Sequence, residues 1–192
     1  MNEWEDMYKE GEWPWETFKP EKHLADLFKK NKIPKGKALD MGCGLGTHAI
    51  FLAKQEMNVK AFDLSEKAIE IARERAEKEK VKVDFFVQDV NNVNFKENEF
   101  DFVFDRGLFH HLNSKEKKHY LEKLVFFLKK NGKYQLIAFS SKNTGFEKAL
   151  SEKEVKEFFK KHFKVLEVKE VIHVEPQGSK VFLNSYFMEK TN

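Results

Sequence analysis

One segment restricts the fold of this chain more than any other: a short apolar run that ends in three closely spaced glycines and continues into a helical pattern. The run Lys37–Met41 has the length and composition of a buried strand. Gly42, Gly44 and Gly46 follow it, and apolar residues then recur at helical spacing over Thr47–Gln55. A strand, a glycine turn and a helix in this order are typical of the first unit of a doubly wound α/β fold.

Strand-like runs and helical patterns continue to alternate along the chain. Such alternation predicts a mostly parallel sheet with helices on both faces. Only the short link Glu175–Ser179 separates the last two runs, so we expect them to pair antiparallel at one edge. The predicted strands are Lys37–Met41, Asn58–Phe62, Lys82–Val87, Phe100–Phe104, Gly132–Phe139, Phe163–His173 and Lys180–Phe187. The predicted helices are Glu21–Asn31, Thr47–Gln55, Ser65–Glu79, Lys115–Leu128 and one that begins after Ser151.

The ends of the helices are also marked in the sequence. Ser65, Ser114 and Ser151 stand at expected helix starts, where a serine side chain accepts a hydrogen bond from a free backbone N–H. Asn131–Gly132 is expected to stop the helix before the fifth strand. The predicted architecture is a doubly wound, three-layer α/β sandwich with a mostly parallel seven-stranded sheet and an antiparallel edge hairpin.

The whole chain, residues 1–192, is expected to form one domain. An N-terminal cover and helix are expected at 1–31, a ligand-binding core at 36–139, and a C-terminal helix with the edge strands at 140–192.

Composition limits the class of protein. Charged residues make up 35% of the chain and hydrophobic residues 41%, which is typical of a globular protein that folds in water. The formal net charge of +3 is too small to indicate a nucleic-acid partner. The sequence contains neither a signal-peptide pattern nor a membrane span, and its single cysteine, Cys43, is typical of a reducing compartment. We therefore expect a cytoplasmic monomer or homodimer without a membrane partner.

The spacing of the glycines limits the class of ligand that this loop can bind. A dinucleotide-binding loop has the pattern GxGxxG, whereas this loop has the pattern GxGxG. Thr47 stands where the third glycine of a dinucleotide loop would fall. Asp40, before the first glycine, would repel a pyrophosphate and suits a ligand with a cationic amino group. An NAD-dependent oxidoreductase is therefore not expected.

Two further acids stand at the ends of the next strands. Asp63 follows the glycines by about 20 residues, a spacing at which an acid accepts hydrogen bonds from ribose hydroxyls. Asp89 ends the third strand and is placed to bind an exocyclic amine. The alternatives are that Asp63 only supports the start of the helix beside Ser65 and that Asp89 lies in solvent. With Asp40, these acids predict a ligand that combines adenosine with an amino acid.

The segments that carry these residues resemble, in order, the motifs of the class I S-adenosylmethionine (SAM)-dependent methyltransferases. ALDMGCGLGTHAIFLA resembles motif I, FDLSEKAIEIARE the next motif, and FFVQDV and FDFVFDRGLFHHL the third and fourth. The match runs from Ala38 to Leu112. It implies SAM as the cofactor, S-adenosylhomocysteine as the product, a small-molecule acceptor and no metal.

The resemblance also implies the roles of individual residues. The glycines would line the methionine and ribose, the acid after the second strand would hold the ribose hydroxyls, and Asp89 with the Val90 backbone would contact adenine. Leu64 would pack on the adenine ring, and Asp105 and Arg106 would flank the methionine. The implied cofactor-binding residues are Trp4, Trp15, Asp40, Gly42, Cys43, Gly44, Gly46, Asp63, Leu64, Asp89, Val90, Asp105 and Arg106.

The N-terminal segment narrows the resemblance to one group of these methyltransferases. Trp4–Glu16 is similar to the N-terminal cover of the thiopurine, thiol/halide and tellurite-resistance methyltransferases, and the Asp105–Gly107 step also resembles that group. The chain has Asn143–Glu147 where the group often has a proline-containing loop. The resemblance implies an acceptor such as a thiol, a chalcogen oxyanion or a halide.

Catalytic residues are expected at Tyr8, Arg106, His110 and His111. The tryptophans near Tyr8 (Trp4, Trp13 and Trp15) are expected either to form an aromatic lid over the sulfonium or only to pack on the domain. One histidine is expected to act as a general base or to orient the acceptor. The alternative is that one histidine is buried or capping and the other exposed. A soft nucleophile needs no strong base.

The sequence also bears on other classes of acceptor. The Asn/Asp-Pro-Pro-aromatic signature of methyltransferases that act on bases is missing after the fourth strand, and Lys148–Lys164 alternates lysine with glutamate like a solvated helix face. Nucleic acid is therefore not the expected substrate. Two alternatives stay open: an O- or N-methyltransferase of a small metabolite or quinone-like ring, and a SAM-binding protein without catalysis.

Overall fold

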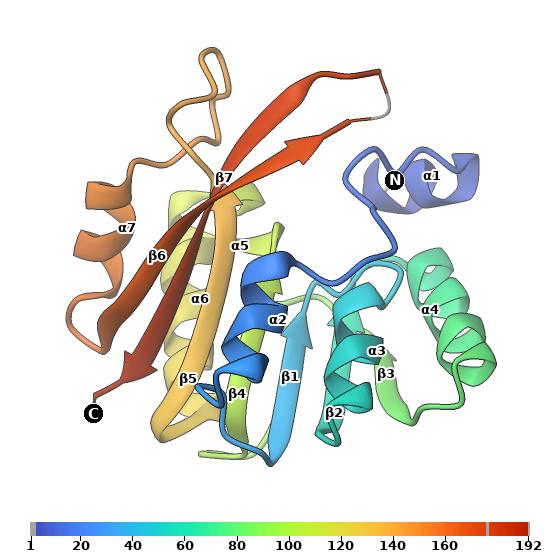
Figure 1. The fold of residues 1–192 in the computed structure, drawn as a ribbon, viewed down its shortest axis with the longest axis horizontal. Coiled ribbons are helices and arrows are strands. Elements are labelled where there is room, and N and C mark those ends of the chain that lie inside the picture. Colours follow the sequence, from blue (N-terminus) through green and yellow to red (C-terminus); the bar gives the residue numbers. More distant parts are fainter. Residues whose placement is uncertain (1–2, 176, 192) are drawn as a thin grey trace.

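Seven strands form one sheet in the computed structural model, which describes residues 3–175 and 177–191. The strands are β1 (Lys37–Met41), β2 (Asn58–Asp63), β3 (Val83–Val87), β4 (Phe100–Arg106), β5 (Leu128–Phe139), β6 (Phe163–Val174) and β7 (Lys180–Lys190). Their order is β3-β2-β1-β4-β5-β7-β6, with β1 to β5 parallel and β7 antiparallel to both of its neighbours (Figure 1). The predicted mostly parallel sheet with an antiparallel edge hairpin is confirmed. The predicted link of that hairpin includes Pro176, which lies outside the described residues.

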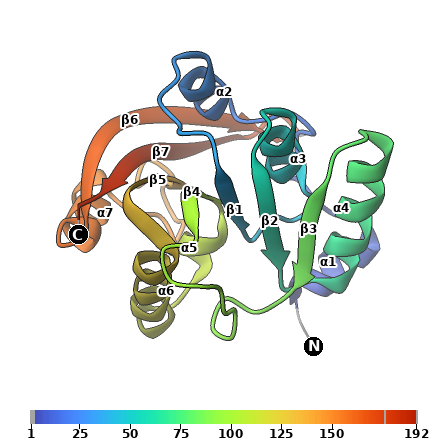
Figure 2. The same cartoon turned by 90° about the horizontal axis from the view of Figure 1, so that it is seen from below.

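Helices cover both faces of this sheet (Figure 2). Helices α2, α3 and α4 pack on one face, and α5, α6 and α7 pack on the other. The helices are α1 (Glu3–Glu10), α2 (Lys22–Lys29), α3 (Thr47–Lys54), α4 (Glu66–Lys78), α5 (Leu108–His111), α6 (Ser114–Phe127) and α7 (Glu152–Phe159).

The two cores follow from the alternation of side chains along each strand. On β1, Ala38 joins the core under α2, α3 and α4, while Leu39 and Met41 join the core on the α6 side. Both faces of a central parallel strand are covered, so every residue of β1 after Lys37 is buried. Full burial of a leucine or phenylalanine stabilises such a core by about 1.5–3 kcal/mol. Asp40 is the polar residue of β1 that is buried with them.

The strand order indicates where a ligand is expected to bind. The chain runs from β1 to β2 on one side and later enters β4 on the other side of β1. Between β1 and β4, the loops that leave the carboxyl ends of the strands therefore diverge and leave a crevice. The glycine segment 42–46 follows β1 at this point.

Two predicted boundaries are wrong. Asn113, and not Ser114, caps α6: its side chain accepts from the backbone N–H groups of Lys115 and Glu116, and Glu116 bonds back to the Asn113 N–H. Asparagine caps as well as serine does, and this reciprocal pair selects it. The helix also ends at Phe127, before the predicted stop, because the next residue already pairs with β4 through a register shift. Ser65 and Ser151 cap α4 and α7 as predicted.

The N-terminal cover contains a helix, α1, that was not predicted from the sequence. α1 has Glu3, Glu5 and Asp6 in its first turn and Lys9 in its last. Charges placed in this way interact favourably with the helix dipole and stabilise the helix. Figures 1 and 2 both show α1 beside α4. We call residues 3–21 the N-terminal arm.

Candidate functional site

The loop between β1 and α3 requires its glycines. Gly42, Gly44 and Gly46 have φ values of 69°, 52° and 75°, in the left-handed region that favours glycine. A Cβ on Gly44 would lie 2.7 Å from the Tyr8 hydroxyl oxygen, and a Cβ on Gly46 would lie 2.9 Å from the Cβ of Ala72. The loop therefore presents bare backbone and is covered closely by the arm and by α4.

Cys43 contributes backbone and not its thiol to this loop. The backbone N–H groups of Gly42 and Cys43 both donate to the Phe62 carbonyl, at 2.9 Å. The Cys43 side chain is buried, and burial raises the pKa of its thiol. The thiol therefore stays protonated.

Asp40 is a buried acid with an unused oxygen. The residue is 1% exposed, and its Oδ2 has no hydrogen-bond partner among the described residues. Burial raises the pKa of Asp40, and the nearby Asp105 raises it further. A buried unpaired acceptor costs stability unless a ligand supplies a donor. A cationic amino group is such a donor, so Asp40 fits the amino acid part of SAM.

Asp63 ends β2 and ties the glycine loop to the next helix. Its Oδ2 accepts from the Gly44 N–H at 2.8 Å, and its Oδ1 accepts from the Ser65 N–H at 3.0 Å. Burial raises the pKa of this carboxyl. Ser65, and not Asp63, caps α4 through its side chain. A carboxylate oxygen accepts more than one hydrogen bond, so ribose hydroxyls fit here beside the backbone partners.

The ends of β2 and β3 expose apolar side chains. Leu64, Phe86 and Val87 are each 39–44% exposed although large apolar side chains are mostly buried in such a fold. An adenine ring would cover such a surface. Asp89 follows β3, and its Oδ1 accepts from the backbone N–H of Asn91 at 2.7 Å and from the Asn91 side chain. Val90 beside it is buried. These residues stay candidates for the adenine contact.

Asp105, at the end of β4, supports α5. Its carboxylate accepts from the backbone N–H groups of Leu108 and Phe109 and from the Tyr120 hydroxyl, at 3.0, 3.1 and 2.7 Å. The Tyr120 hydroxyl also bonds to the Tyr134 hydroxyl at 2.8 Å. Burial raises the pKa of Asp105 to about 7 although these hydrogen bonds lower it. The acid thus fixes the helix that carries the two histidines.

Arg106 binds the N-terminal arm. Its Nε donates to Glu21 Oε1 at 2.7 Å, and its guanidinium also donates to the Trp15 carbonyl at 3.1 Å. Both charged side chains of the pair are largely buried, with 11% and 13% of their surface exposed. The structure therefore places Arg106 between the end of β4 and the arm.

The aromatic residues of the arm lie over the glycine loop. Tyr8 is 5% exposed and packs with Leu45 and Ala68, against which the three tryptophans also pack. The Trp4 ring contacts the Trp15 ring edge-on at 5.6 Å and the His111 ring at 4.7 Å. Burial raises the pKa of Tyr8, with a further contribution from Asp63, so its hydroxyl stays protonated. The arm therefore covers the glycine loop and α5 together.

Hydrogen bonds attach the arm to α4, to β6 and to the end of β4. Glu5 Oε2 accepts from the Ser65 hydroxyl at 2.6 Å and from the Lys67 N–H at 3.2 Å, and these contacts with α4 lower the pKa of Glu5 to about 2. His173 Nε2 lies 2.7 Å from the Pro14 carbonyl, which ties the arm to β6. The Arg106 pair attaches the arm to the end of β4.

The two histidines of α5 lie in different surroundings. His110 is 2% exposed and stacks on the Phe139 ring at 3.8 Å. Its Nδ1 accepts from the Phe139 backbone N–H at 3.2 Å. His111 is partly exposed, and its Nδ1 accepts from the Lys148 ammonium at 3.2 Å. The two rings are 4.4 Å apart.

Several residues of the site had no signal in the sequence. Glu5, Glu21, Phe139 and Lys148 contact site residues that are far away in the chain, so spacing alone does not point to them. His48 is the exception, because it lies two residues after the last glycine of the motif. Its ring lies 4.7 Å from the Phe104 ring, and its buried Nε2 has no hydrogen-bond partner in the described part of the chain.

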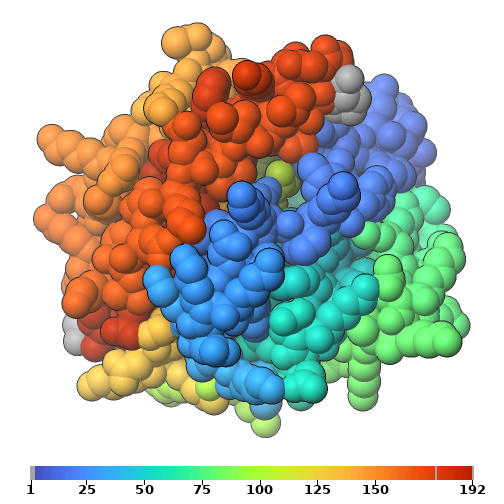
Figure 3. Space-filling model, in the orientation of Figure 1, coloured from blue at the N-terminus to red at the C-terminus, as the bar shows by residue number. Residues whose placement is uncertain are grey.

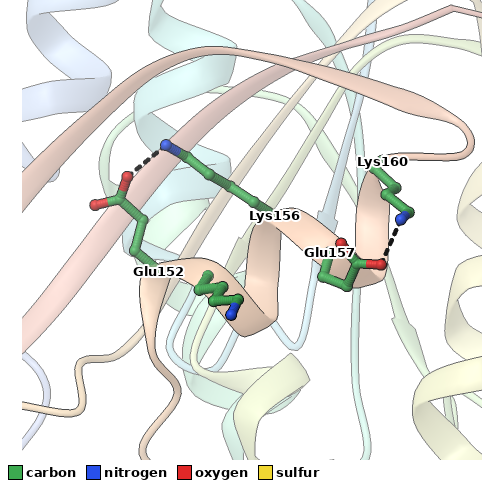
Figure 4. A pocket seen from close by; sticks show the side chains of 5 residues that line it. Glu152, Lys156, Glu157 and Lys160 are labelled. Atoms are coloured by element: carbon green, nitrogen blue, oxygen red, sulfur yellow. Dashed lines mark ion pairs between the residues drawn. The ribbon is translucent and has the colours of Figure 1, made fainter.

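The surface is hollowed beside the arm. Figure 3 shows a depression between the blue N-terminal segment and the red C-terminal strands, with yellow-green atoms of the segment around β4 and α5 at its base. A second, shallow hollow lies on α7 and is lined by Glu152, Lys153, Lys156, Glu157 and Lys160 (Figure 4). Its charges pair along the helix, Lys156 with Glu152 and Lys160 with Glu157. This is a solvated helix face of the kind the sequence indicates, and it contains none of the site residues.

The described residues form neither a membrane-spanning helix nor a cluster of metal ligands. None of the helices in residues 3–175 and 177–191 has the length and apolar character needed to cross a membrane. The same residues contain no group of three or more histidine, cysteine, aspartate or glutamate side chains placed to hold a metal ion.

Known proteins share this sequence pattern. Residues 38–132 match the family described as Methyltransferase domain. An uncharacterised methyltransferase of Schizosaccharomyces pombe is 32% identical over 105 residues, which are 55% of this chain and 72% of that protein. Thiocyanate methyltransferase 1 of Brassica oleracea is 29% identical over 136 residues, which are 67% of this chain and 58% of that protein. The matches span 30%, 56% and 58% of the first three curated relatives.

The fold is shared with solved methyltransferase structures. The 1,6-didemethyltoxoflavin-N1-methyltransferase of Burkholderia thailandensis superposes with a TM-score of 0.81 at 21% identity, covering 97% of this chain and 85% of that chain. That structure contains bound S-adenosylhomocysteine. The likeness confirms the doubly wound fold.

Proposed function

Because the chain belongs to the class I SAM-dependent methyltransferases, with SAM as the family's cofactor, we propose that it transfers a methyl group to a small molecule: a thiol, a chalcogen oxyanion or a halide-like anion. SAM, when bound, supplies a methyl group on a sulfonium and leaves as a neutral thioether. The observation that carries the proposal is the shared cover: Tyr8 lies against the glycine loop, and Trp4 lies against His111 on α5.

The chain's own residues have three tasks in this reaction. Asp40, Asp63 and the bare glycine backbone bind and orient the cofactor. The aromatic side chains of the arm exclude water from the space between the glycine loop and α5, which strengthens the electrostatic interactions inside it. α5, fixed by Asp105, positions the acceptor, because methyl transfer requires the acceptor atom in line with the breaking bond.

Two observations support this class of acceptor. The thiocyanate methyltransferase of Brassica oleracea is similar over most of this chain. Two carboxylates near α5 are already engaged by protein groups: Asp105 accepts three hydrogen bonds, and Glu21 is paired with Arg106.

The test is a screen with labelled SAM against thiocyanate, iodide, small thiols, tellurite and selenite. We expect a methylated product from at least one soft anion, detected by mass spectrometry of the headspace. An Asp63→Asn variant should lose cofactor affinity and turnover together, whereas Glu157→Gln, a change on α7, should leave both unchanged. Tight SAM binding with no transfer to any acceptor would favour the non-catalytic alternative.

A second candidate is methylation of oxygen or nitrogen on a flat ring. Aromatic side chains beside α5 favour it: Phe139 stacks on His110, and Phe146 contacts Phe139 at 5.3 Å. Small phenols and hydroxyquinolines in the same screen separate the two candidates. Products from phenols but not from soft anions would establish the second.

A further inference from the structure

We infer that His110 and His111 both serve as neutral hydrogen-bond donors through Nε2, so that the site binds an acceptor whose reacting atom is already an anion. The inference rests on the proposed function and names the chemical state in which the acceptor is bound. The histidines would hold the anion and would not remove a proton from it.

The tautomer of His110 follows from its backbone contact. A backbone N–H only donates, so the Phe139 N–H at 3.2 Å requires a lone pair on His110 Nδ1. A neutral imidazole with a lone pair on Nδ1 carries its proton on Nε2. This Nε2 is buried and has no hydrogen-bond partner within the described residues. The structure therefore contains a buried donor that no protein group uses.

The position of the ring places this donor near the end of β4. The Cε1 atom, which lies between Nδ1 and Nε2 in the ring, is 4.0 Å from the place a Cβ would occupy on Gly107. Gly107 directly follows β4, where the crevice between β1 and β4 opens. Nδ1 is engaged by Phe139 on β5, and Nε2, the other nitrogen bonded to Cε1, is the one left without a partner among the described residues.

His111 has the same tautomer for a different reason. A lysine ammonium has three donors and no acceptor, so the Lys148 contact at 3.2 Å requires a lone pair on His111 Nδ1. The proton of the neutral ring is again on Nε2. The Trp4 ring lies edge-on to this ring, with 4.7 Å between the ring centroids, so the arm covers it. Both histidines of α5 thus carry the proton of the neutral ring on Nε2.

The surrounding charges favour an anion over a cation. Burial lowers the pKa of His110 well below its usual range, and His111, Lys117, Arg106 and Lys148 lower it further. Burial, with Lys148, lowers the pKa of His111 to about 4. Both rings are therefore neutral at pH 7. Glu21 neutralises Arg106, which leaves Lys117 and Lys148 as the cations nearest to the pair.

A base is unnecessary for such an acceptor. A lone pair of the anion forms the new bond to the methyl carbon while the carbon–sulfur bond breaks and its electron pair stays on sulfur. No proton leaves the acceptor, so none has to be accepted by a histidine. A general base at His110 would need its lone pair on Nε2, which would place an Nδ1–H against the Phe139 N–H.

The first experiment determines the tautomers of His110 and His111 and requires no methyl transfer. In ¹⁵N-labelled protein saturated with S-adenosylhomocysteine, both rings should show a pyrrole-type shift at Nε2 and a pyridine-type shift at Nδ1 from pH 5 to pH 8. Potassium thiocyanate, but not potassium chloride at equal ionic strength, should shift the Nε2–H signals. A pyridine-type Nε2 on His110, or no response to thiocyanate, would overturn the inference.

The second experiment separates a donor from a base. Thiocyanate is an anion throughout this pH range, so the loss of a base would not affect its methylation. His110→Phe keeps the aromatic stacking and removes the donor, and it should weaken thiocyanate binding and kcat/KM about ten- to hundredfold, the effect of a lost hydrogen bond to a charge. His110→Gln, whose amide supplies a donor, should recover part of this loss.

Matched controls keep the result interpretable. His162→Gln, between α7 and β6, should change neither value. His111→Phe provides the same measurement if His110→Phe does not fold, and a normal thiocyanate affinity in that variant would overturn the inference for His111. If no acceptor is methylated at all, the proposed function fails, while the ¹⁵N spectra and the thiocyanate titration still decide the inference.

Discussion

The glycine loop and α5 follow the neighbouring strands β1 and β4, and they are built in different ways. The loop is held by contacts between neighbouring units of the chain: Asp63 at the end of β2 binds Gly44, and Phe62 binds Gly42 and Cys43. α5 is held by residues from more distant segments, Phe139 and Lys148. The cofactor half is thus a local motif, whereas the acceptor half is a product of tertiary structure.

This difference has a consequence for variation. A local motif tolerates few changes, because each glycine meets both a backbone requirement and a packing requirement. A site assembled from several distant segments changes its shape when any one of these segments changes. Acceptor selectivity is therefore expected to vary more easily than cofactor binding.

The largest effect is expected from Gly46→Val in the loop. The residue has a φ of 75°, and a Cβ there would lie 2.9 Å from the Ala72 Cβ and 3.1 Å from the Phe85 ring. Backbone strain and overpacking together should lower the free energy of unfolding by about 3 kcal/mol or more. Urea denaturation measures this effect, with Gly145→Ala as the control, because a Cβ at Gly145 meets no atom within 4 Å. Equal losses in the two variants would show that packing against α4 is unimportant.

A smaller effect is expected from Tyr120→Phe under α5. The change removes one donor from Asp105 and one partner from Tyr134, and it should cost about 2 kcal/mol. The Tyr120 hydrogen bond lowers the pKa of Asp105, so this pKa should rise above its value of about 7. Denaturation and ¹³C NMR of the Asp105 carboxyl measure the two effects. Tyr186→Phe is the control, and a shift of Asp105 in that variant would contradict the assignment.

A pH-dependent effect is expected where the arm meets α4. Hydrogen bonds from Ser65 and Lys67 lower the pKa of Glu5 to about 2 from 4.5. A lowered pKa means that this contact stabilises the closed arm fully above pH 4.5 and is lost as the pH falls toward 2. Tryptophan fluorescence of the arm should therefore stay constant from pH 7 to pH 5 and change below it.

Glu5→Gln is the matching variant for that titration. At pH 7 its tryptophan fluorescence should already be shifted toward the value that the unchanged protein reaches at low pH. The further change in fluorescence below pH 5 should be mostly lost. If its titration matches the unchanged protein, Glu5 does not hold the arm.

The smallest effect is expected from Lys156→Gln on α7. Its ion pair with Glu152 is exposed and spans one helical turn, so its loss should cost less than about 0.5 kcal/mol. Acceptor and cofactor affinity should stay unchanged in titration calorimetry. A change in either affinity would show that α7 contributes to the site.

The sequence predicts the loop side well. Gly42, Gly44 and Gly46 have the positive φ values that a glycine turn requires, and Ser65 caps α4 as its position indicates. Both features depend on residues close in sequence, and their physical causes are visible there. The prediction of a cap at Ser114 was wrong because Asn113 is also a capping residue type, and only its pairing with Glu116 decides for it.

The acceptor side could be predicted only in part. The position of His110 and His111 after β4 follows from the fold, but the groups that fix their tautomers do not. Phe139 ends β5 and Lys148 lies nine residues further along the chain, and nothing in their spacing indicates a contact with α5. The roles of Tyr8, Arg106, Asp89 and the other candidate residues in binding stay predictions.

The Arg106–Glu21 pair stands at the end of the arm where α2 begins. α2 is anchored by the buried Leu24 and Leu27, and within the arm Pro14 is tied to β6 through His173. α1 contacts α4 through Glu5 and packs over the glycine loop through its aromatic side chains, and Gly11, with a φ of 80°, links α1 to the rest of the arm. If α1 moves when molecules enter or leave the site, Gly11 is the expected hinge.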